Sequence, residues 1–197
     1  MKMPKGKKIE RILRVLLNEP DGNLSKYKIA KNSQTSFSWV HEYLTKLENL
    51  GHLKDTTVTN IPALFEIWKN QRNNIQKKNF VINDPMALLS DVSLEYALTT
   101  YQGENIVQGY LFPSRFDIYI QNKDYNSWNE LLKESGLMGA GNFRILIDDD
   151  HVFYKSIKLN EFTVVSTPQL IVDLYKEGGV CGEAADNLVR RMVQNIV

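Results

Sequence analysis

Apolar positions in the first third of the chain recur at the spacing of amphipathic helices. The pattern predicts three helices, over about residues 7–18, 26–31 and 36–50. Residues 52–59 are rich in strand formers and predict a small strand pair. One more helix is expected over 61–75. The inward faces of the first and third helices comprise Ile9, Ile12, Leu13, Leu16 and Leu17, then Phe37, Val40, Leu44, Leu47 and Leu50.

The rest of the chain mixes strand patterns with helical ones. Short apolar or alternating runs predict strands over 80–82, 116–120, 143–147, 152–154 and 162–165. Other apolar runs predict helices over 86–89, 94–101, 125–133, 168–176 and 183–195. The polar stretch Asn70–Asn79 has no apolar period and is the candidate linker. The expected fold class is therefore α+β, with a helical domain over 1–75 and a mixed α/β domain over 80–197.

Composition narrows the class of protein. The 197 residues are 43% apolar and 24% charged, which is enough apolar material for a packed core. No apolar run approaches the ~18 residues that a membrane span needs, so we expect no membrane partner. The single cysteine, Cys181, excludes an internal disulfide and fits a reducing, cytoplasmic location.

The net charge of +1 hides a strong asymmetry along the chain. Residues 1–80 hold 15 Lys and Arg against 7 Asp and Glu, whereas residues 81–197 hold 9 against 16. Cationic side chains bind phosphates and release the counterions condensed on them. The basic front part therefore favours a polyanion as partner, and the acidic back part is a poor nucleic-acid surface.

Three helices followed by a small strand pair are the layout of a winged helix-turn-helix. The motif residues lie in Leu24–Lys31 and Ser36–Leu53. In these residues the sequence resembles the winged-helix transcriptional regulators of the MarR-like and archaeal kind. The resemblance implies that the third helix enters the major groove of double-stranded DNA.

The candidate DNA-contacting side chains lie mainly off the apolar stripes of the second and third helices. They are Lys26, Lys28, Lys31, Ser36, Ser38, Trp39, His41, Thr45, Lys46 and Lys54. Hydroxyl and imidazole groups can bond to bases or phosphates, and lysines can pair with phosphates. Trp39 could equally pack against the second helix. The competing interpretation is a winged helix that contacts only proteins, with these polar residues solvated.

A second resemblance covers most of residues 95–190. Its short matches are Tyr96–Thr100, Phe112–Ile120, Gly141–Phe143, Ser166–Leu174, Gly178-Gly179 and Glu183–Leu188. These segments resemble the effector domain of the abortive-infection type IV antitoxins, or AbiEi-like regulators. The resemblance implies a protein that represses its own operon and binds a toxin or another protein partner through this domain. Val180-Cys181-Gly182 stands where many relatives carry an arginine.

The same domain loosely resembles a nucleotidyltransferase fold in degenerate form. That chemistry needs a Gly-Ser turn and two or three carboxylates to hold Mg²⁺ on a triphosphate. Gly109 and Ser114 are not adjacent, and Asp117 is followed two residues later by Tyr119 instead of an acid. We therefore expect no enzyme activity, no catalytic residues, no bound metal and no cofactor. The acidic run 148–150 fits a solvated hairpin tip better than a cation site.

These observations favour a DNA-binding transcriptional regulator of the autorepressing, antitoxin-like kind. Two copies, as a homodimer, would bind an operator through the third helix and the wing. One alternative is a nucleotidyltransferase-like enzyme targeted by a winged helix. The other is a protein-interaction scaffold, which would show no salt-dependent DNA binding.

Overall fold

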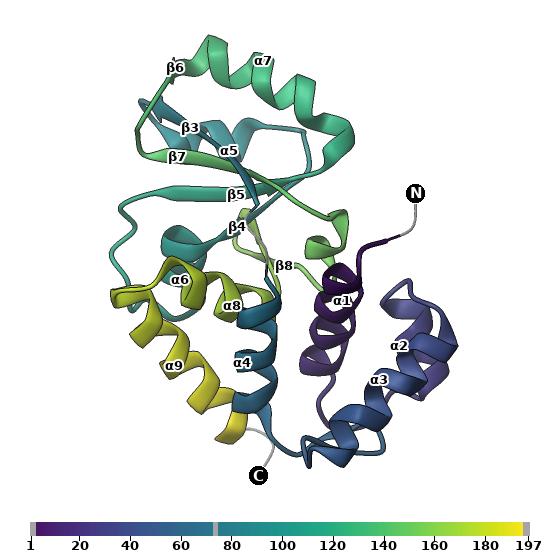
Figure 1. Ribbon diagram of the computed structural model, residues 1–197. Helices are drawn as coiled ribbons and strands as arrows, with labels where there is room; N and C mark the ends of the chain where they lie inside the picture. Colours follow the sequence, from purple (N-terminus) through teal and green to yellow (C-terminus); the bar gives the residue numbers. More distant parts are fainter. Residues whose placement is uncertain (1–2, 73–74, 195–197) are drawn as a thin grey trace. The chain divides into compact units, whose positions relative to one another are not determined.

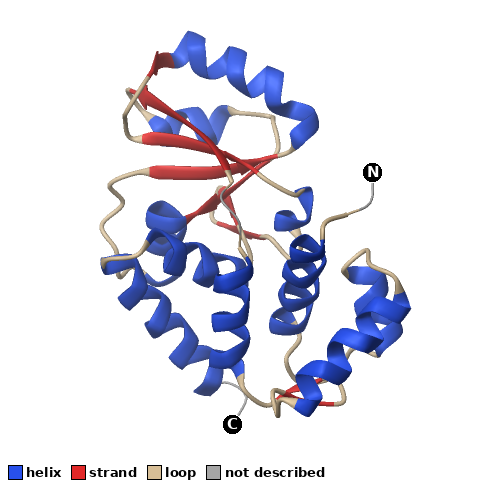
Figure 2. Ribbon diagram, viewed as in Figure 1, coloured by secondary structure: helices blue, strands red, loops and turns tan. Residues whose placement is uncertain are grey.

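The computed structural model describes residues 3–72 and 75–194. It has an α+β fold, as predicted: N-terminal helices with a small hairpin precede a mixed seven-stranded sheet with flanking helices (Figures 1 and 2). The chain divides into two compact units. The described residues of the first unit are 3–72, 167–176 and 185–194, and those of the second are 75–166 and 177–184.

The N-terminal part of the first unit contains four helices and one hairpin. They are α1 (Lys5–Asn18), α2 (Lys26–Asn32), α3 (Phe37–Asn49), β1 (Leu53–Lys54), β2 (Thr57–Val58) and α4 (Ile61–Gln71). Local signals set the ends of these helices. The Ser25 hydroxyl caps α2 by accepting a hydrogen bond from the Lys28 N–H, and Asn60 caps α4 in the same way. Gly51, at φ +75°, follows the end of α3 in the left-handed conformation that suits glycine.

The apolar faces of these helices form the interior of the first unit. The predicted residues Ile12, Leu13 and Leu16 of α1 and Val40, Leu44 and Leu47 of α3 are all buried. The prediction is wrong for Phe37 and Leu50, which are 51% and 55% exposed, while Tyr43 is buried. Phe37 is the first residue of α3 and Leu50 is its C-cap. The regular apolar spacing thus continues to both ends of α3, whereas neighbouring elements cover only its middle part.

A helix from late in the sequence, α8 (Thr167–Glu177), also belongs to the first unit except for its last residue. Buried polar groups connect it to α1 and to Arg72, the C-cap of α4. Arg72 pairs with Glu10 and with Asp173, each at 2.8 Å. The Arg14 Nε donates to the Gln169 side chain at 2.8 Å, and Gln169 donates to Asp173 at 2.9 Å. These five side chains are almost fully buried, and the two arginines among them offset the charge of the two carboxylates.

The compact units therefore do not follow one cut in the sequence, whereas the predicted domain boundary lies between residues 75 and 80. Helix α9 (Val180–Gln194) is likewise divided between the units, at residues 184 and 185. The predicted linker Asn70–Asn79 is wrong at both ends. Its first two residues end α4 and its last four begin a strand, while residues 73–74 lie outside the described residues.

The second unit is built on the seven-stranded sheet, with strand order β6-β3-β7-β5-β4-β9-β8. Strands β5 and β7 are parallel, as are β4 and β9, and the other neighbours are antiparallel. The strands are β3 (Gln76–Ile82), β4 (Tyr96–Thr99), β5 (Phe116–Ile120), β6 (Gly136–Met138), β7 (Phe143–Ile147), β8 (Ile157–Leu159) and β9 (Phe162–Val164).

One face of this sheet carries the hydrophobic core of the second unit. Ile118 and Ile120 of β5 alternate with residues that point to the other face, as a period of two requires. They pack with Trp128 and Leu132 of α7 (Tyr125–Ser135) and with Leu89 of α5 (Pro85–Asp91). Helix α6 (Thr100–Gln108) follows β4 directly.

Two further predictions fail in the second unit. The predicted helix over 94–101 is wrong, because 96–99 form β4, in which all four residues are buried. A strand buried on both faces has no alternating pattern that distinguishes it from a helix. The predicted strand over 152–154 is also wrong. Asp150–Phe153 form a short 3₁₀ helix, η2, in which Asp149 accepts a hydrogen bond from the His151 N–H.

Candidate nucleic-acid interface

The polar face of α3 lies opposite its buried apolar face. Ser38, His41 and Thr45 follow one another at intervals of three and four residues, which places them on one side of the helix. All three are exposed, and so is the neighbouring Lys46. The Thr45 hydroxyl donates to the His41 carbonyl at 2.9 Å, which leaves its oxygen free to accept a hydrogen bond. The His41 ring stacks on the exposed Phe37 ring, with 6.1 Å between centroids.

The amino end of α3 is open. Ser36 is at the N-cap position, but its side chain makes no capping hydrogen bond, in contrast to Ser25 at the start of α2. The first backbone N–H groups of a helix have no partner within that helix. They can donate to an anion such as a phosphate, which the helix dipole also favours.

The lysines of α2 and of the hairpin lie on elements that contact α3, and they differ in their surroundings. Lys28 and Lys31 are exposed on α2, and Lys54 is exposed on β1. Lys26 is less accessible, because its ammonium group pairs with Asp55 at 3.1 Å. Asp55 lies in the hairpin turn, where its N–H donates to the Glu48 carboxylate at 3.0 Å.

Trp39 lies toward α1. Its ring stacks on Tyr43 with 5.6 Å between centroids, and the Lys8 ammonium lies 5.3 Å from the Trp39 ring. A hollow of about 100 Å³ opens beside these rings. It is lined by Lys5, Ile9, Trp39, Glu42, Tyr43 and Lys46. Burial raises the pKa of the Tyr43 phenol, which therefore stays neutral in this basic setting.

Lys5 and Lys8 are two basic residues beside the α3 surface that the predicted set lacks. They belong to the basic run Lys5-Gly6-Lys7-Lys8. This run directly precedes the first apolar stripe, and that position could have indicated their place beside the first helix. The surface is not uniformly basic. Glu42 and Glu48 are exposed on α3 itself, so α3 carries both signs of charge.

In the second unit, the carboxylate of Asp117 lies in a buried ionic network. Arg115 and Arg144 each pair with it at 2.8 Å, and the Thr100 hydroxyl also donates to it. Both arginines also pair with Glu177, at 2.5 and 2.9 Å. Burial alone would raise the pKa of Glu177, but hydrogen bonds from the two arginines outweigh it and hold that pKa below its ordinary value. Two arginines thus balance two carboxylates, and this joins β5, β7 and the end of α8.

Cys181 is a buried free cysteine, and the acidic run 148–150 leads into η2. Burial raises the pKa of the Cys181 thiol, which is therefore protonated near neutral pH and a weak nucleophile. The Asp150 carboxylate accepts hydrogen bonds from Asn122. Within residues 3–72 and 75–194, no group of three or more His, Cys, Asp or Glu could hold a metal ion. None of the helices in these ranges has the length and apolar character needed to cross a membrane.

Comparison with known proteins gives no relative. The chain matches no protein-family model, no curated protein and no solved structure.

Proposed function

We propose that this protein is a transcriptional regulator that binds double-stranded DNA through a winged helix-turn-helix formed by α1–α3 and the β1–β2 hairpin. The observation that carries the proposal is the division of α3 into two faces. Val40, Leu44 and Leu47 are buried, while Ser38 and His41 are exposed near its uncapped amino end. A recognition helix uses its N-terminal residues for base edges in the major groove.

The exposed side chains divide into two roles. Ser38, His41 and Thr45 offer hydrogen bonds to base edges. Basic groups around them contact phosphates and set the register on the duplex. These are Lys28 and Lys31 of α2, Lys46 of α3, Lys54 of the hairpin, and Lys5 and Lys8 beside Trp39. The ion pair between Lys26 and Asp55 makes Lys26 a weaker phosphate contact than Lys28 or Lys31.

The basic character of residues 1–80 is a second observation that supports this proposal. Lysines on α1, α2, α3 and β1 supply an excess of positive charge, which a DNA-binding surface needs. The acids at Glu42, Glu48 and Asp55 lower the local potential and disfavour indiscriminate binding to any polyanion. Specificity then depends on the base-facing groups of α3.

Two copies of the chain bind a pseudo-palindromic operator in the cytoplasm, because one such module buries too little surface for high affinity. The operator lies in the protein's own promoter, as in an autorepressing antitoxin. The acidic second unit binds a toxin or another protein partner. These parts of the proposal rest on the sequence resemblances, and the DNA-binding part also rests on the α3 surface.

The test is fluorescence anisotropy with a labelled duplex from upstream of the protein's own gene, against a shuffled duplex of the same composition. We expect tighter binding to the natural duplex, and a smaller preference for it after Ser38→Ala or His41→Ala. Each lost base contact corresponds to about 1–3 kcal/mol of discrimination. Lys176→Ala is the control, since Lys176 is an exposed lysine on α8, outside the winged helix-turn-helix.

Four results would contradict the proposal. Equal affinity for both duplexes would contradict specific binding to an operator. If His41→Ala preferred the natural duplex as strongly as the wild type does, base recognition by His41 of α3 would be contradicted. Incorporation of labelled nucleotide with Mg²⁺, lost on Asp117→Ala, would instead indicate the nucleotidyltransferase-like alternative. Absence of any salt-sensitive DNA binding would favour the protein-interaction scaffold.

A further inference from the structure

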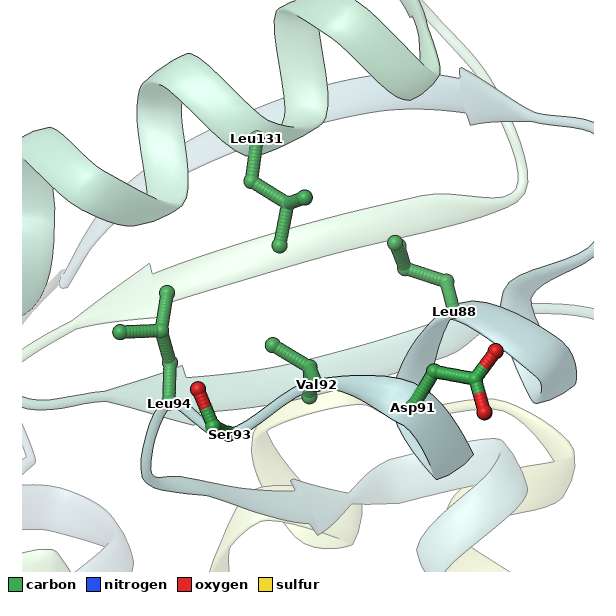
Figure 3. Close-up of a pocket in the computed structure, with 6 residues that line it drawn as sticks. All are labelled: Leu88, Asp91, Val92, Ser93, Leu94 and Leu131. Atoms are coloured by element: carbon green, nitrogen blue, oxygen red, sulfur yellow. The ribbon is translucent and has the colours of Figure 1, made fainter.

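The second unit contains an apolar hollow of about 400 Å³ on the core side of its sheet. Small-molecule sites typically have volumes of about 300–1,000 Å³ and mostly apolar walls with a few polar groups. Its lining residues are Leu88, Asp91, Val92, Ser93, Leu94 and Leu131. Figure 3 shows Leu131 of α7 pointing across the hollow toward Leu88 of α5 and the segment that follows α5.

The apolar wall is an incompletely covered part of the core. Leu88, Val92, Leu94 and Leu131 each pack against the buried cluster that includes Trp128, yet each remains half-buried. Protein interiors are close-packed, so apolar side chains that belong to a core are normally covered. An apolar molecule of fitting shape would remove the rest of their surface from water, which is favourable.

The polar groups at the edge of the hollow indicate which polar group a ligand would carry in addition to its apolar part. Asp91 is the last residue of α5, and its carboxylate is exposed at the rim (Figure 3). Within the described ranges, no hydrogen bond or ion pair engages either the Asp91 carboxylate or the Ser93 hydroxyl. An ionised carboxylate only accepts hydrogen bonds, so the group it binds must be a donor and is best a cation. The net acidic charge of residues 81–197 acts in the same direction.

We propose that this hollow binds a small amphipathic amine, with an aliphatic part against the four apolar side chains and a protonated amino group at Asp91. This site goes beyond the proposed DNA binding and does not depend on it. The ligand class follows from the chemistry of the lining residues, namely an aliphatic wall with one unpaired carboxylate and one hydroxyl at its rim.

The experiment measures binding of n-octylammonium to the full-length protein by calorimetry, without DNA and below the micelle concentration. We expect saturable binding, and weaker binding of n-octanol and of octanoate, which lack the cation. Shortening the chain to hexyl and then butyl should weaken binding by about tenfold at each step, because each buried CH₂ contributes to transfer from water. Equal affinity for octylammonium and octanoate, or no saturable binding, would overturn the proposal.

Variants localise the site. Asp91→Asn should weaken octylammonium binding about two- to fivefold, the range for an exposed ionic contact, and leave octanol binding unchanged. Glu161→Gln is the matched control, because Glu161 is an exposed carboxylate outside the hollow, and its variant should bind as the wild type does. Val92→Phe places a larger side chain in the hollow and should abolish binding of all three probes. If Val92→Phe does not fold, the comparison of Asp91→Asn with Glu161→Gln still shows whether octylammonium binds at Asp91. Wild-type affinity in Asp91→Asn would refute the site.

Discussion

Replacing Arg72 with methionine would leave two buried carboxylates without the guanidinium group that pairs with both. Arg72 joins Glu10 of α1 to Asp173 of α8, each at 2.8 Å. The three side chains are between 1% and 5% exposed. Methionine has a similar length and keeps the apolar contacts of the stem, so the substitution isolates the charge.

The magnitude follows from the burial of the partners. Removing one member of a buried ion pair costs about 3–5 kcal/mol, because the partner's charge stays buried and loses its main counter-charge. Whole proteins are stable by only about 5–15 kcal/mol, so Arg72→Met should remove a large share of the free energy of unfolding. In a chain of this size that corresponds to a fall in Tm of about 6–20 °C.

Urea denaturation followed by circular dichroism measures the effect. The control is Lys69→Met on the same helix, because the Lys69–Glu66 pair at 2.6 Å is 31% and 57% exposed and should be worth less than about 1 kcal/mol. A triple variant in which Glu10, Arg72 and Asp173 all become apolar should recover much of the loss. A cost below about 1 kcal/mol for Arg72→Met would refute the reasoning that this network joins α8 to the N-terminal helices.

Three other predictions concern local structure and pH. Gly182→Ala in α9 should stabilise the protein by up to about 1 kcal/mol, because the new methyl group meets open space. Gly136→Ala should destabilise it by about 1–3 kcal/mol, because the new methyl group clashes with the neighbouring strand. Thermal unfolding of both variants checks this, and a shift of Tm in the same direction for both would contradict it. The pKa of Glu177 is below its ordinary value in the folded state, so its ionised form contributes stability at neutral pH that is lost as the pH falls. Glu177→Gln should therefore make urea stability less dependent on pH between about pH 5 and 3, and an unchanged pH dependence would contradict this. Ser25→Ala should cost about 1 kcal/mol by removing a helix cap, and Ser36→Ala less than about 0.5 kcal/mol, as measured by urea denaturation; equal costs would contradict the capping difference.

The N-terminal helices could be predicted from the sequence because their signals are local. Helix α2 has a capping serine at Ser25, and α3 ends before Gly51 in the conformation that glycine favours. Prediction fails for segments whose secondary structure depends on pairing with distant parts of the chain. Strand β4 is a run of buried residues that reads as a helix until its pairing with β5 and β9 is known.

The grouping of α8 with the N-terminal helices depends on contacts across most of the chain. Arg14 and Gln169, which share a hydrogen bond, are 155 positions apart, and no local pattern indicates such a partner. An arginine such as Arg14 reads as a surface residue in a helical pattern, because its burial depends on this polar partner and on the Trp68 ring.

The candidate DNA surface could be predicted in part. The exposure of Ser38, His41 and Thr45 follows directly from helical periodicity, since they lie off the apolar stripe. The surroundings of Trp39 and Lys26 could not be predicted, because they depend on Lys8 and Asp55, which approach from other elements. Both pairings alter which cations are available for phosphates.

The salt dependence of DNA affinity tests the central proposal most directly. For the natural upstream duplex, the logarithm of the binding constant should fall linearly with the logarithm of the salt concentration, by about 0.9 per phosphate contact. Lys28→Ala and Lys46→Ala should each reduce that slope by about 1, while Lys176→Ala should leave it unchanged. A slope near zero in the wild type, or the same slope in all four proteins, would contradict DNA binding through the surface of α2 and α3.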